Sequence, residues 1–328
     1  MNIAVFEVSS DERAEFDRLS RTLDVNLRLV EGNLSMDTLF RAEGCEAVST
    51  LGRSRLDREL LGALKAMGIG FVSTRTIGVD HIDLAAAKEL GLRVSHAAYP
   101  PDAVADFTLM LILMVLRRYK PAMWRQQVND YSLYGLMGRS LRRQTVGVVG
   151  TGSIGAAVIR ALAGFGCRIL AYNLVECEDL RPWATFVDLE TIYRECDIIT
   201  FHVPATAETR RMVNRESLSR MKDGVILINT ARGELMDIDA VTEGIETEKI
   251  GSLAMDVFEN EQGIYHADRK TDILRNKDMV YLRQFPNVVL TQHMAFYTEE
   301  SIISMVDCGI ESLLDMKAGR PTRLEVSA

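Results

Sequence analysis

The stretch TVGVVGTGSIG, residues 145–155, decides the fold of this chain. Five residues rich in valine, typical of a buried strand, run directly into a Gly-x-Gly-x-x-Gly pattern formed by Gly150, Gly152 and Gly155. A helical pattern follows, and residues 168–172 have the character of a second strand. In such a unit the first glycine permits a tight turn, the second lets a pyrophosphate approach the backbone, and the third lets the helix pack against the strand. The motif therefore predicts a dinucleotide-binding site.

Neighbouring positions predict how the dinucleotide is held. Ser153 and Ile154 open the helix, where free N–H groups attract phosphate. Asn173 follows the second strand, at the place where an acidic residue ordinarily binds the adenosine ribose of NAD. Its amide still bonds a ribose hydroxyl, and no Lys or Arg lies between it and Arg181 to bind the additional phosphate of NADP. We therefore expect NAD as the cofactor and keep NADP as the alternative.

Strands and helices alternate along the sequence. Short β-branched runs predict strands at residues 2–6, 25–30, 47–50, 70–73 and 92–95, and helical spacing occurs at 11–22, 36–43, 57–67 and 80–90. Further strands are predicted at 197–201, 225–229, 252–256 and 288–291. Repeated strand–helix–strand units form parallel sheets with helices on both faces. The sequence therefore predicts an α/β fold with two doubly wound parallel sheets.

Two consecutive prolines, Pro100 and Pro101, mark the predicted domain boundary, because proline breaks both helices and strand ladders. We expect residues 1–100 together with 299–328 to form a flavodoxin-like substrate domain. Residues 101–298 should form a Rossmann dinucleotide-binding domain, with a cleft between the two domains. A C-terminal helix would return the chain to the first domain.

A long apolar helix is predicted from Asp102 to about Tyr119, just before Pro121. Its middle, residues 107–116, is apolar on nearly all sides, which indicates burial. A helix within the core and a helix packed between domains or subunits both fit this pattern.

Composition disfavours several classes of protein. The chain has 328 residues, 47% of them hydrophobic, and a net charge of −8, so nucleic acid and anionic membranes are poor partners. The longest apolar run is about half of what a bilayer requires. The five cysteines are scattered without the spacing of a metal site. We therefore expect no metal and reduced thiols in the cytoplasm.

Three polar residues follow predicted strands. Arg232 lies in a turn after one strand, Glu261 lies in an acidic segment after the next, and His293 follows the last. Taken singly they fit a surface arginine, a solvated turn and a core histidine. The carboxyl ends of parallel strands, however, face the ligand crevice of a doubly wound sheet. Reduction of a 2-keto acid needs a cation for the carboxylate, an acid for the forming alkoxide and a hydride donor, which Arg, His and NADH supply.

Together with three further segments, these motifs resemble the D-isomer-specific 2-hydroxyacid dehydrogenases, most closely the D-lactate dehydrogenase branch that includes enzymes of vancomycin-resistance operons. The segments are STRTIGVDHID at 73–83, YPPDAVAD at 99–106 and FYT at 296–298. The resemblance covers nearly the whole chain. It implies NAD-dependent reduction of 2-keto acids to D-2-hydroxy acids by a cytoplasmic homodimer, with a small-molecule substrate and neither nucleic acid nor membrane as partner.

The resemblance also implies roles for individual residues. Arg232 would bind the substrate carboxylate, His293 would protonate the keto oxygen, and Glu261 would orient the histidine. The implied cofactor contacts beyond the glycine loop are Val203, Pro204, Thr230 and Asp256, the last near the nicotinamide carboxamide. The implied substrate contacts are the backbone N–H groups of Ile77 and Gly78 and the side chains of Tyr99, Leu51 and Phe296.

Some features leave the substrate and the reaction open. Leu51 and Gly52 are less bulky than an aromatic pair, so we expect branched or aromatic 2-keto acids to be reduced alongside pyruvate. Gln292 and Met294 stand where the family often has Pro and Thr. The alternatives are an NADH-sensing corepressor or scaffold protein, and a formate- or phosphite-type dehydrogenase; Glu261 argues against a formate dehydrogenase. We interpret His81, His96 and His266 as structural or exposed. His202 lies in a segment that we expect to line the adenine side of the cofactor, without a catalytic role.

Overall fold

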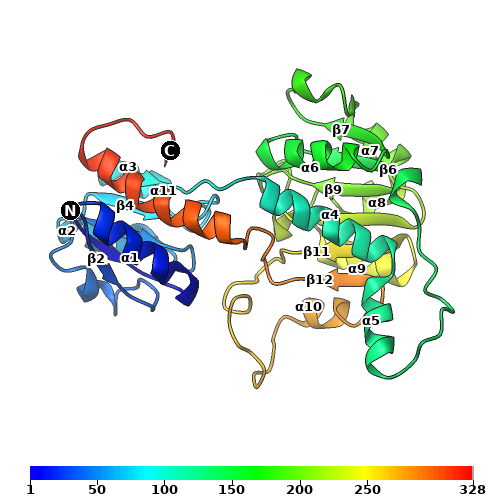
Figure 1. Cartoon of the computed structure of the whole chain (residues 1–328), viewed down its shortest axis with the longest axis horizontal. Coiled ribbons are helices and arrows are strands. Elements are labelled where there is room, and N and C mark those ends of the chain that lie inside the picture. Colours follow the sequence, from blue (N-terminus) through cyan, green and yellow to red (C-terminus); the bar gives the residue numbers. More distant parts are fainter. Residues whose placement is uncertain (327–328) are drawn as a thin grey trace. The chain divides into compact units, whose positions relative to one another are not determined.

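The computed structural model describes residues 1–326. The chain forms two compact units: unit 1 contains residues 1–100 and the segment from Tyr297 onward, and unit 2 contains Pro101–Phe296. The boundaries expected from the sequence, at residues 100 and 298, lie within two residues of these positions. Each unit is built on one sheet with helices on both faces (Figure 1), so the predicted α/β class with two parallel sheets is confirmed.

Unit 1 contains a six-stranded sheet in the order β13-β5-β4-β3-β1-β2. Its strands are β1 (Asn2–Val5), β2 (Asn26–Leu29), β3 (Ala47–Thr50), β4 (Phe71–Thr74), β5 (Arg93–Ser95) and β13 (Glu325–Val326). All neighbours pair in parallel except β13, which runs antiparallel to β5. The direction of winding reverses between β1 and β3, so the segments after these two strands diverge at the point where doubly wound sheets bind ligands.

Helices cover both faces of this sheet because alternate strand residues point to opposite sides. On one face, Ile3 and Val5 pack with apolar residues of α1 (Arg13–Thr22) and α11 (Glu299–Lys317). On the other face, Ala4 and Phe6 pack with residues of α2 (Arg58–Ala66) and α3 (Leu84–Glu89). The predicted C-terminal helix is thus part of the core of unit 1.

Unit 2 contains a seven-stranded parallel sheet in the order β12-β11-β10-β9-β6-β7-β8. Its strands are β6 (Thr145–Val149), β7 (Arg168–Tyr172), β8 (Thr185–Phe186), β9 (Ile198–Phe201), β10 (Val225–Asn229), β11 (Ile250–Met255) and β12 (Val288–Leu290). Helices α4 (Asp102–Leu116) and α6 (Ser153–Ala163) share one core cluster. Helices α7 (Leu189–Glu195), α8 (Arg215–Arg220), α9 (Ile238–Glu246) and α10 (Lys277–Leu282) contribute to the cluster on the other face. Winding reverses between β6 and β9, which places the glycine loop at the switch point.

The long apolar helix is a core helix of unit 2. Leu109, Leu111 and Ile112 of α4 are buried against the sheet and against α6. The helix ends at Leu116, and after Arg118, which has φ of 50°, a second helix α5 (Tyr119–Gln127) begins. Pro121 was expected to follow the end of the long helix, but it lies in the first turn of α5. The missing N–H of proline costs nothing there, because first-turn N–H groups have no partner within the helix.

Two further expectations about helices need correction. Residues 36–43 form a single 3-10 turn, Leu39–Ala42, rather than a helix. The hydroxyl of Thr38 donates to the carbonyl oxygen of Asn33 at 2.7 Å, and such local bonds compete with helical ones. The predicted helix at 80–90 begins at Leu84, because the carboxylate of Asp83 accepts from the N–H of Ala86 and caps the first turn.

Short 3-10 helices occur at Ser10–Glu12, Leu141–Arg143, Glu178–Leu180 and Gly233–Leu235. In the described part of the chain, no helix combines the length and apolar character that a transmembrane span requires.

Candidate active site

The glycine loop after β6 has the geometry of a phosphate cradle. Gly150 has φ of +94°, and a Cβ on it would lie 2.5 Å from the carbonyl oxygen of His202. A Cβ on Gly155 would lie 1.9 Å from the carbonyl oxygen of Gly150, so these two positions require glycine. A Cβ on Gly152 would meet no atom within 4 Å, which leaves open space beside the backbone at this point. Gly150 and Gly155 are thus needed for the backbone geometry of the loop, and the approach of a pyrophosphate at Gly152 stays a prediction.

The residues around this loop fit a bound dinucleotide. Helix α6 begins at Ser153 with Gly152 as N-cap, and no side chain caps its first turn, so its N–H groups are free to donate to an anion. The buried hydroxyl of Thr151 has no hydrogen-bond partner in the described structure. Asn173 supports the loop: its Oδ1 accepts from the Thr151 N–H at 3.3 Å, and its Nδ2 donates to the Val175 carbonyl at 2.7 Å.

The segment after β9 closes the other side of the glycine loop. Val203 lies next to Gly150, because its Cγ1 would be 2.8 Å from a Cβ there. His202 is paired with the Thr200 hydroxyl at 2.9 Å, and burial lowers its pKa to about 3. The imidazole is therefore neutral at physiological pH and acts as a packing residue. Pro204 follows directly in the chain.

Arg232 lies in a turn that is stabilised by Asn229, the last residue of β10. Asn229 is fully buried; its Nδ2 donates to the Arg232 carbonyl at 2.8 Å, and its Oδ1 accepts from the Ala231 N–H at 3.0 Å. The hydroxyl of Thr230, in the same turn, lies 3.0 Å from that of Thr108 on α4. Sequence reasoning did not single out Asn229, although a buried amide at a strand end is a recurrent turn device.

Gly233 brings the Arg232 turn against the acidic segment that follows β11. A Cβ on Gly233 would lie 2.3 Å from both the Phe258 carbonyl carbon and the Glu259 nitrogen. The two backbones therefore touch, and any larger residue would separate them. This contact places the turn of Arg232 beside the segment that carries Glu261.

Asp256 organises the loop around His293. It is fully buried directly after β11, and its carboxylate accepts from the N–H groups of Met294 at 3.0 Å and Ala295 at 2.8 Å and from the Thr291 hydroxyl at 2.5 Å. Its own carbonyl accepts from the His293 N–H at 2.7 Å. Asp256 is therefore a structural anchor of the histidine loop, and its predicted proximity to the nicotinamide remains a prediction.

Glu261 and His293 form the predicted acid–imidazole pair. The Nδ1 of His293 is hydrogen-bonded to Oε1 of Glu261, and Oε2 of Glu261 accepts from the Phe258 N–H at 2.6 Å. The histidine side chain is 34% exposed. Because Nδ1 is occupied, Nε2 is the nitrogen available to a ligand.

Two aromatic neighbours complete the surroundings of His293. Nε2 of His266 donates to the His293 carbonyl at 3.0 Å, and the two rings lie 6.1 Å apart. The ring of Phe296 lies edge-on to His293 at 6.3 Å. His266 was interpreted as structural or exposed; it supports the histidine loop, and its position in a long segment without periodic pattern gave no signal of this contact.

The remaining predicted substrate residues belong to unit 1. Leu51 directly follows β3, Ile77 and Gly78 follow β4, and Tyr99 precedes the chain's passage into unit 2. The hydroxyl of Thr76 donates to the Gly78 carbonyl at 2.7 Å and shapes this turn.

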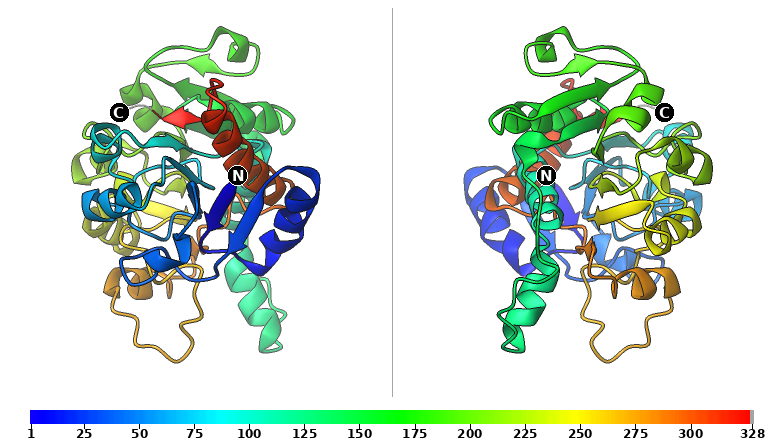
Figure 2. Two further views of the ribbon diagram at one scale, coloured as in Figure 1. Left: turned by 90° about the vertical axis from the view of Figure 1, so that its left-hand side faces the viewer. Right: turned by 90° about the vertical axis from the view of Figure 1, so that its right-hand side faces the viewer.

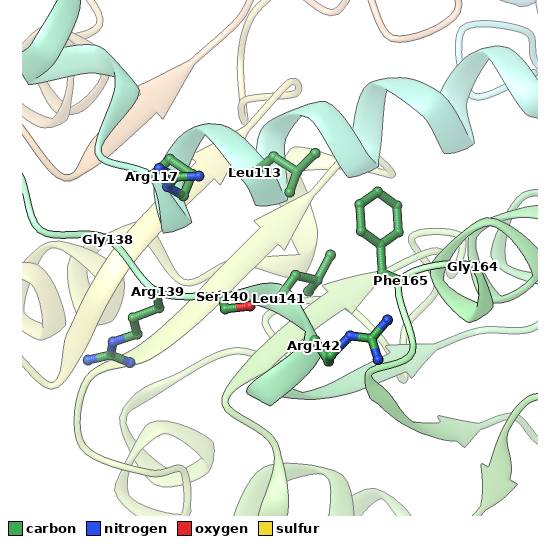
Figure 3. Close-up of a pocket in the computed structure, with 9 residues that line it drawn as sticks. All are labelled: Leu113, Arg117, Gly138, Arg139, Ser140, Leu141, Arg142, Gly164 and Phe165. Atoms are coloured by element: carbon green, nitrogen blue, oxygen red, sulfur yellow. The ribbon is translucent and has the colours of Figure 1, made fainter.

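Unit 2 also contains a cavity of about 550 Å³ (Figure 3). It is bordered by the end of α4, the segment before β6 and the residues after α6. Its lining includes Arg117, Arg139, Arg142 and Phe165, and none of the predicted site residues.

A dinucleotide cradle and an Arg–Glu–His set on adjacent strand ends of one sheet define an NAD-dependent dehydrogenase. The sequence model of the family described as D-isomer specific 2-hydroxyacid dehydrogenase, NAD binding domain, matches residues 109–295. The chain belongs to this family, as the resemblance implied.

Relatives match over nearly the whole length. An aromatic 2-oxoacid reductase of Clostridium sporogenes is 37% identical over 319 residues, which cover 97% of this chain and 96% of that protein. A D-specific alpha-keto acid dehydrogenase of Enterococcus faecium is 37% identical over 317 residues, 97% of each chain. A D-isomer specific 2-hydroxyacid dehydrogenase from Lactobacillus delbrueckii ssp. bulgaricus, solved in its NAD complexed form, matches 100% of both chains with a TM-score of 0.85 and 28% identity.

These findings confirm the predicted enzyme class and cofactor. The chain is an NAD-dependent oxidoreductase that reduces 2-keto acids to D-2-hydroxy acids. The two alternative functions, an NADH-sensing corepressor or scaffold and a formate- or phosphite-type dehydrogenase, are not favoured.

Proposed function

We propose that this enzyme reduces pyruvate and also bulkier branched or aromatic 2-keto acids. The main observation behind this proposal is the hydrogen bond between His293 and Glu261. Asp256 binds the loop that carries His293 to the end of a strand, next to the turn that carries Arg232. The breadth of substrates is supported by the small Leu51–Gly52 pair and by the similarity to an aromatic 2-oxoacid reductase. One methylene changes discrimination by about 1–3 kcal/mol, so a pocket without bulky walls accepts several side chains.

Each catalytic group has one task in this proposal. The guanidinium of Arg232 binds the substrate carboxylate through its planar fork and stabilises charge on the keto oxygen. His293 holds a proton on Nε2 and gives it to that oxygen as the alkoxide forms. Glu261 accepts from Nδ1, fixes the ring orientation and stabilises the imidazolium. NADH supplies the hydride when bound.

The remaining residues bind and orient. Ile77 and Gly78 contribute backbone N–H groups for the substrate carboxylate, and the substrate side chain contacts Tyr99, Leu51 and Phe296. The pyrophosphate of NAD binds at the glycine loop with Ser153 and Ile154. Asn173, Val203, Pro204, Thr230 and Asp256 complete the dinucleotide site.

We also propose a homodimer. Helix α4, a candidate for the subunit contact from its sequence, packs in the core of unit 2 but leaves Met110 39% exposed, and the following segment, residues 119–137, exposes further apolar side chains. Both views of Figure 2 show α5, at the start of this segment, extending away from the sheet. The exposed large apolar side chains of residues 119–137 are Tyr119, Met123, Trp124, Val128, Tyr131, Leu133, Tyr134 and Met137. A patch of this kind is typical of a protein interface, and sedimentation equilibrium of the wild type and of Trp124→Asp tests it.

We also propose that the enzyme is located in the cytoplasm. All five cysteines are free thiols, as in proteins of reducing compartments. Fractionation with an antibody to the chain tests this.

The activity is tested with purified protein, NADH and a panel of pyruvate, 2-ketoisocaproate and phenylpyruvate, followed by absorbance of the reduced nicotinamide and chiral analysis of the product. We expect turnover of all three and D products. His293→Ala should lower kcat by about 10²–10⁴-fold while NADH binding persists, because the proton donor is lost. A pyruvate preference of more than about a hundredfold in kcat/KM would rule out the broad pocket, and L products would overturn the stereochemistry.

A further inference from the structure

Unit 1 buries a carboxylate that the proposed reaction does not use. Glu7 lies two residues after the end of β1, its side chain is fully buried, and its backbone has φ of 61°. A left-handed conformation and a buried charge are both costly for a glutamate. A residue that bears both costs at the switch point of a doubly wound sheet must be held by strong local contacts.

Those contacts come from one neighbouring segment, the residues after β3. Oε2 of Glu7 accepts from the N–H groups of Leu51 at 2.5 Å and Arg53 at 3.2 Å. Oε1 accepts from the hydroxyl of Ser54, which in turn accepts from the Leu34 N–H at 2.8 Å. The two backbone N–H groups on either side of Gly52 thus converge on one oxygen, as they do around a bound anion.

Another buried acid of unit 1 is stabilised differently. Glu12 forms an ion pair with the fully buried Arg75 at 2.7 Å. Glu7 forms no ion pair with any Lys or Arg of the described chain, and its donors are those of the Leu51–Ser54 segment. Its charge is therefore stabilised by the loop, and the loop conformation is in turn fixed by the carboxylate.

The same segment packs on the turn that follows β4. A Cβ on Gly52, which has φ of +89°, would lie 2.9 Å from Cγ2 of Thr76 and 3.5 Å from Cε1 of His81. Thr76 bonds the carbonyl of Gly78, and Thr74 bonds both Thr76 at 2.7 Å and His81 at 3.1 Å. Movement of the Leu51–Ser54 segment would therefore reach the Ile77–Gly78 turn through Thr76, which lies against Gly52 and bonds the Gly78 carbonyl.

We propose that Glu7 is a positioning residue that sets the preference for the substrate side chain, by fixing Leu51 and Gly52 against the turn at Ile77 and Gly78. This inference rests on the proposed roles of those residues in substrate binding. Glu7 itself does not touch the substrate; it acts through the N–H groups of Leu51 and Arg53.

Two substitutions separate this role from simple stability. Glu7→Gly removes the carboxylate and tolerates the left-handed backbone, and Glu7→Gln keeps one acceptor oxygen but places a donor amide opposite the others. We expect Glu7→Gly to change the ratio of kcat/KM for phenylpyruvate to that for pyruvate by about fivefold or more, with a smaller change in Glu7→Gln, since released loops discriminate less between side chains. The dissociation constant of NADH should stay within about twofold, because the dinucleotide residues lie in unit 2.

Val94→Ala is the matched control. Val94 is buried on β5 of the same sheet, so its truncation lowers stability without touching the Leu51–Ser54 segment. Its substrate ratio should equal that of the wild type at a lower Tm. If Glu7→Gly moves the ratio no further than Val94→Ala does, Glu7 is a structural residue and the proposal is wrong.

Hydrogen exchange gives a readout that does not require turnover. The amides of Leu51 and Arg53 should be protected in the wild type and exchange at least about tenfold faster in Glu7→Gly, since their acceptor is gone. Equal exchange in both proteins would overturn the inference. Faster exchange together with a wild type that reduces none of the keto acids would instead support the anchoring by Glu7 and refute the proposed substrates.

Discussion

The N–H of His293 donates to the carbonyl oxygen of Asp256, and the Asp256 carboxylate accepts the next two N–H groups of the same loop, those of Met294 and Ala295. His293 has φ of 53°, a conformation that a non-glycine residue keeps only when its surroundings enforce it. One buried acid therefore fixes both the position and the backbone strain of the proposed proton donor.

Replacement of this acid by its amide tests that dependence. Asp256→Asn places an NH₂ group against an N–H donor of the loop, and an unsatisfied buried donor costs about 1–3 kcal/mol. We expect a lower Tm and a fall in kcat for 2-keto acid reduction of at least about tenfold, since small misplacements of a catalytic group are costly. Unchanged kcat with a lowered Tm would show that the loop keeps its geometry without the carboxylate.

Glu261→Gln should lower kcat for 2-keto acid reduction. In the wild type, Oε1 of Glu261 is hydrogen-bonded to Nδ1 of His293 and holds the ring in place. The amide keeps the shape of the side chain but replaces one acceptor oxygen by a donor, so the ring orientation is no longer fixed. We expect a fall in kcat of about tenfold or more with an unchanged dissociation constant for NADH, because small misplacements of a catalytic group are costly. Steady-state kinetics measures this, and a wild-type kcat would refute the pairing.

Arg232→Ala should raise KM for the keto acid and lower kcat, because the guanidinium is proposed to bind both the carboxylate and the polarised oxygen. Loss of such a group typically costs about 10²–10³ in rate. Arg232→Lys keeps the charge but not the fork, and should recover only part of the loss. Steady-state kinetics with NADH titration checks this. A variant with altered NADH affinity and a normal KM for the keto acid would instead indicate that Arg232 binds the dinucleotide.

Gly233→Ala should destabilise unit 2. The added methyl would lie 2.3 Å from the backbone of Phe258 and Glu259, so one of the two segments must shift. We expect a loss of about 1–3 kcal/mol, as for other overpacked sites, together with reduced kcat. Gly62→Ala is the control: a Cβ there meets no atom within 4 Å in helix α2, so the change should be neutral or stabilising. Thermal and urea denaturation compare the two.

His202 predicts a pH dependence of stability. Its pKa is lowered by burial from 6.5 to about 3, so between these values the unfolded chain binds a proton that the folded chain does not. Stability from this residue is present above about pH 6.5 and is lost as pH falls, by about 1.4 kcal/mol per pH unit. His202→Gln should flatten the slope of unfolding free energy between pH 4 and about 6 by that amount. Parallel slopes for the two proteins would contradict the buried neutral imidazole.

Local patterns made much of the fold and the candidate catalytic set predictable. The glycine motif lies between a strand and a helix, and the polar residues come directly after apolar strands. Both patterns are formed by residues close together in the sequence, so they can be recognised without the structure. Arg232 and His293 were found in this way, because strand ends of one parallel sheet face the same side. The family resemblance then supplied the individual roles.

Features with a competing or very short local signal, and features that depend on contacts distant in the sequence, were not predictable. The helical spacing of residues 36–43 is overridden by hydroxyl bonds of Thr38, and β8 and β13 have two residues each, too few for a periodic signal. Nothing local marks Glu7 as buried, since an acid after a strand is ordinarily solvated and its three donors lie more than forty positions away.

Strand β13 also has a consequence for how this protein is handled. Glu325 on β13 forms a two-point ion pair with Arg93 on β5, at 2.7 and 2.6 Å, and the short strand pairs with the outer side of β5. Without it, the bare β5 edge would offer unpaired backbone groups to another molecule. Proteolytic loss of the segment that contains β13 during purification would therefore promote aggregation. An affinity tag is better attached at the N-terminus.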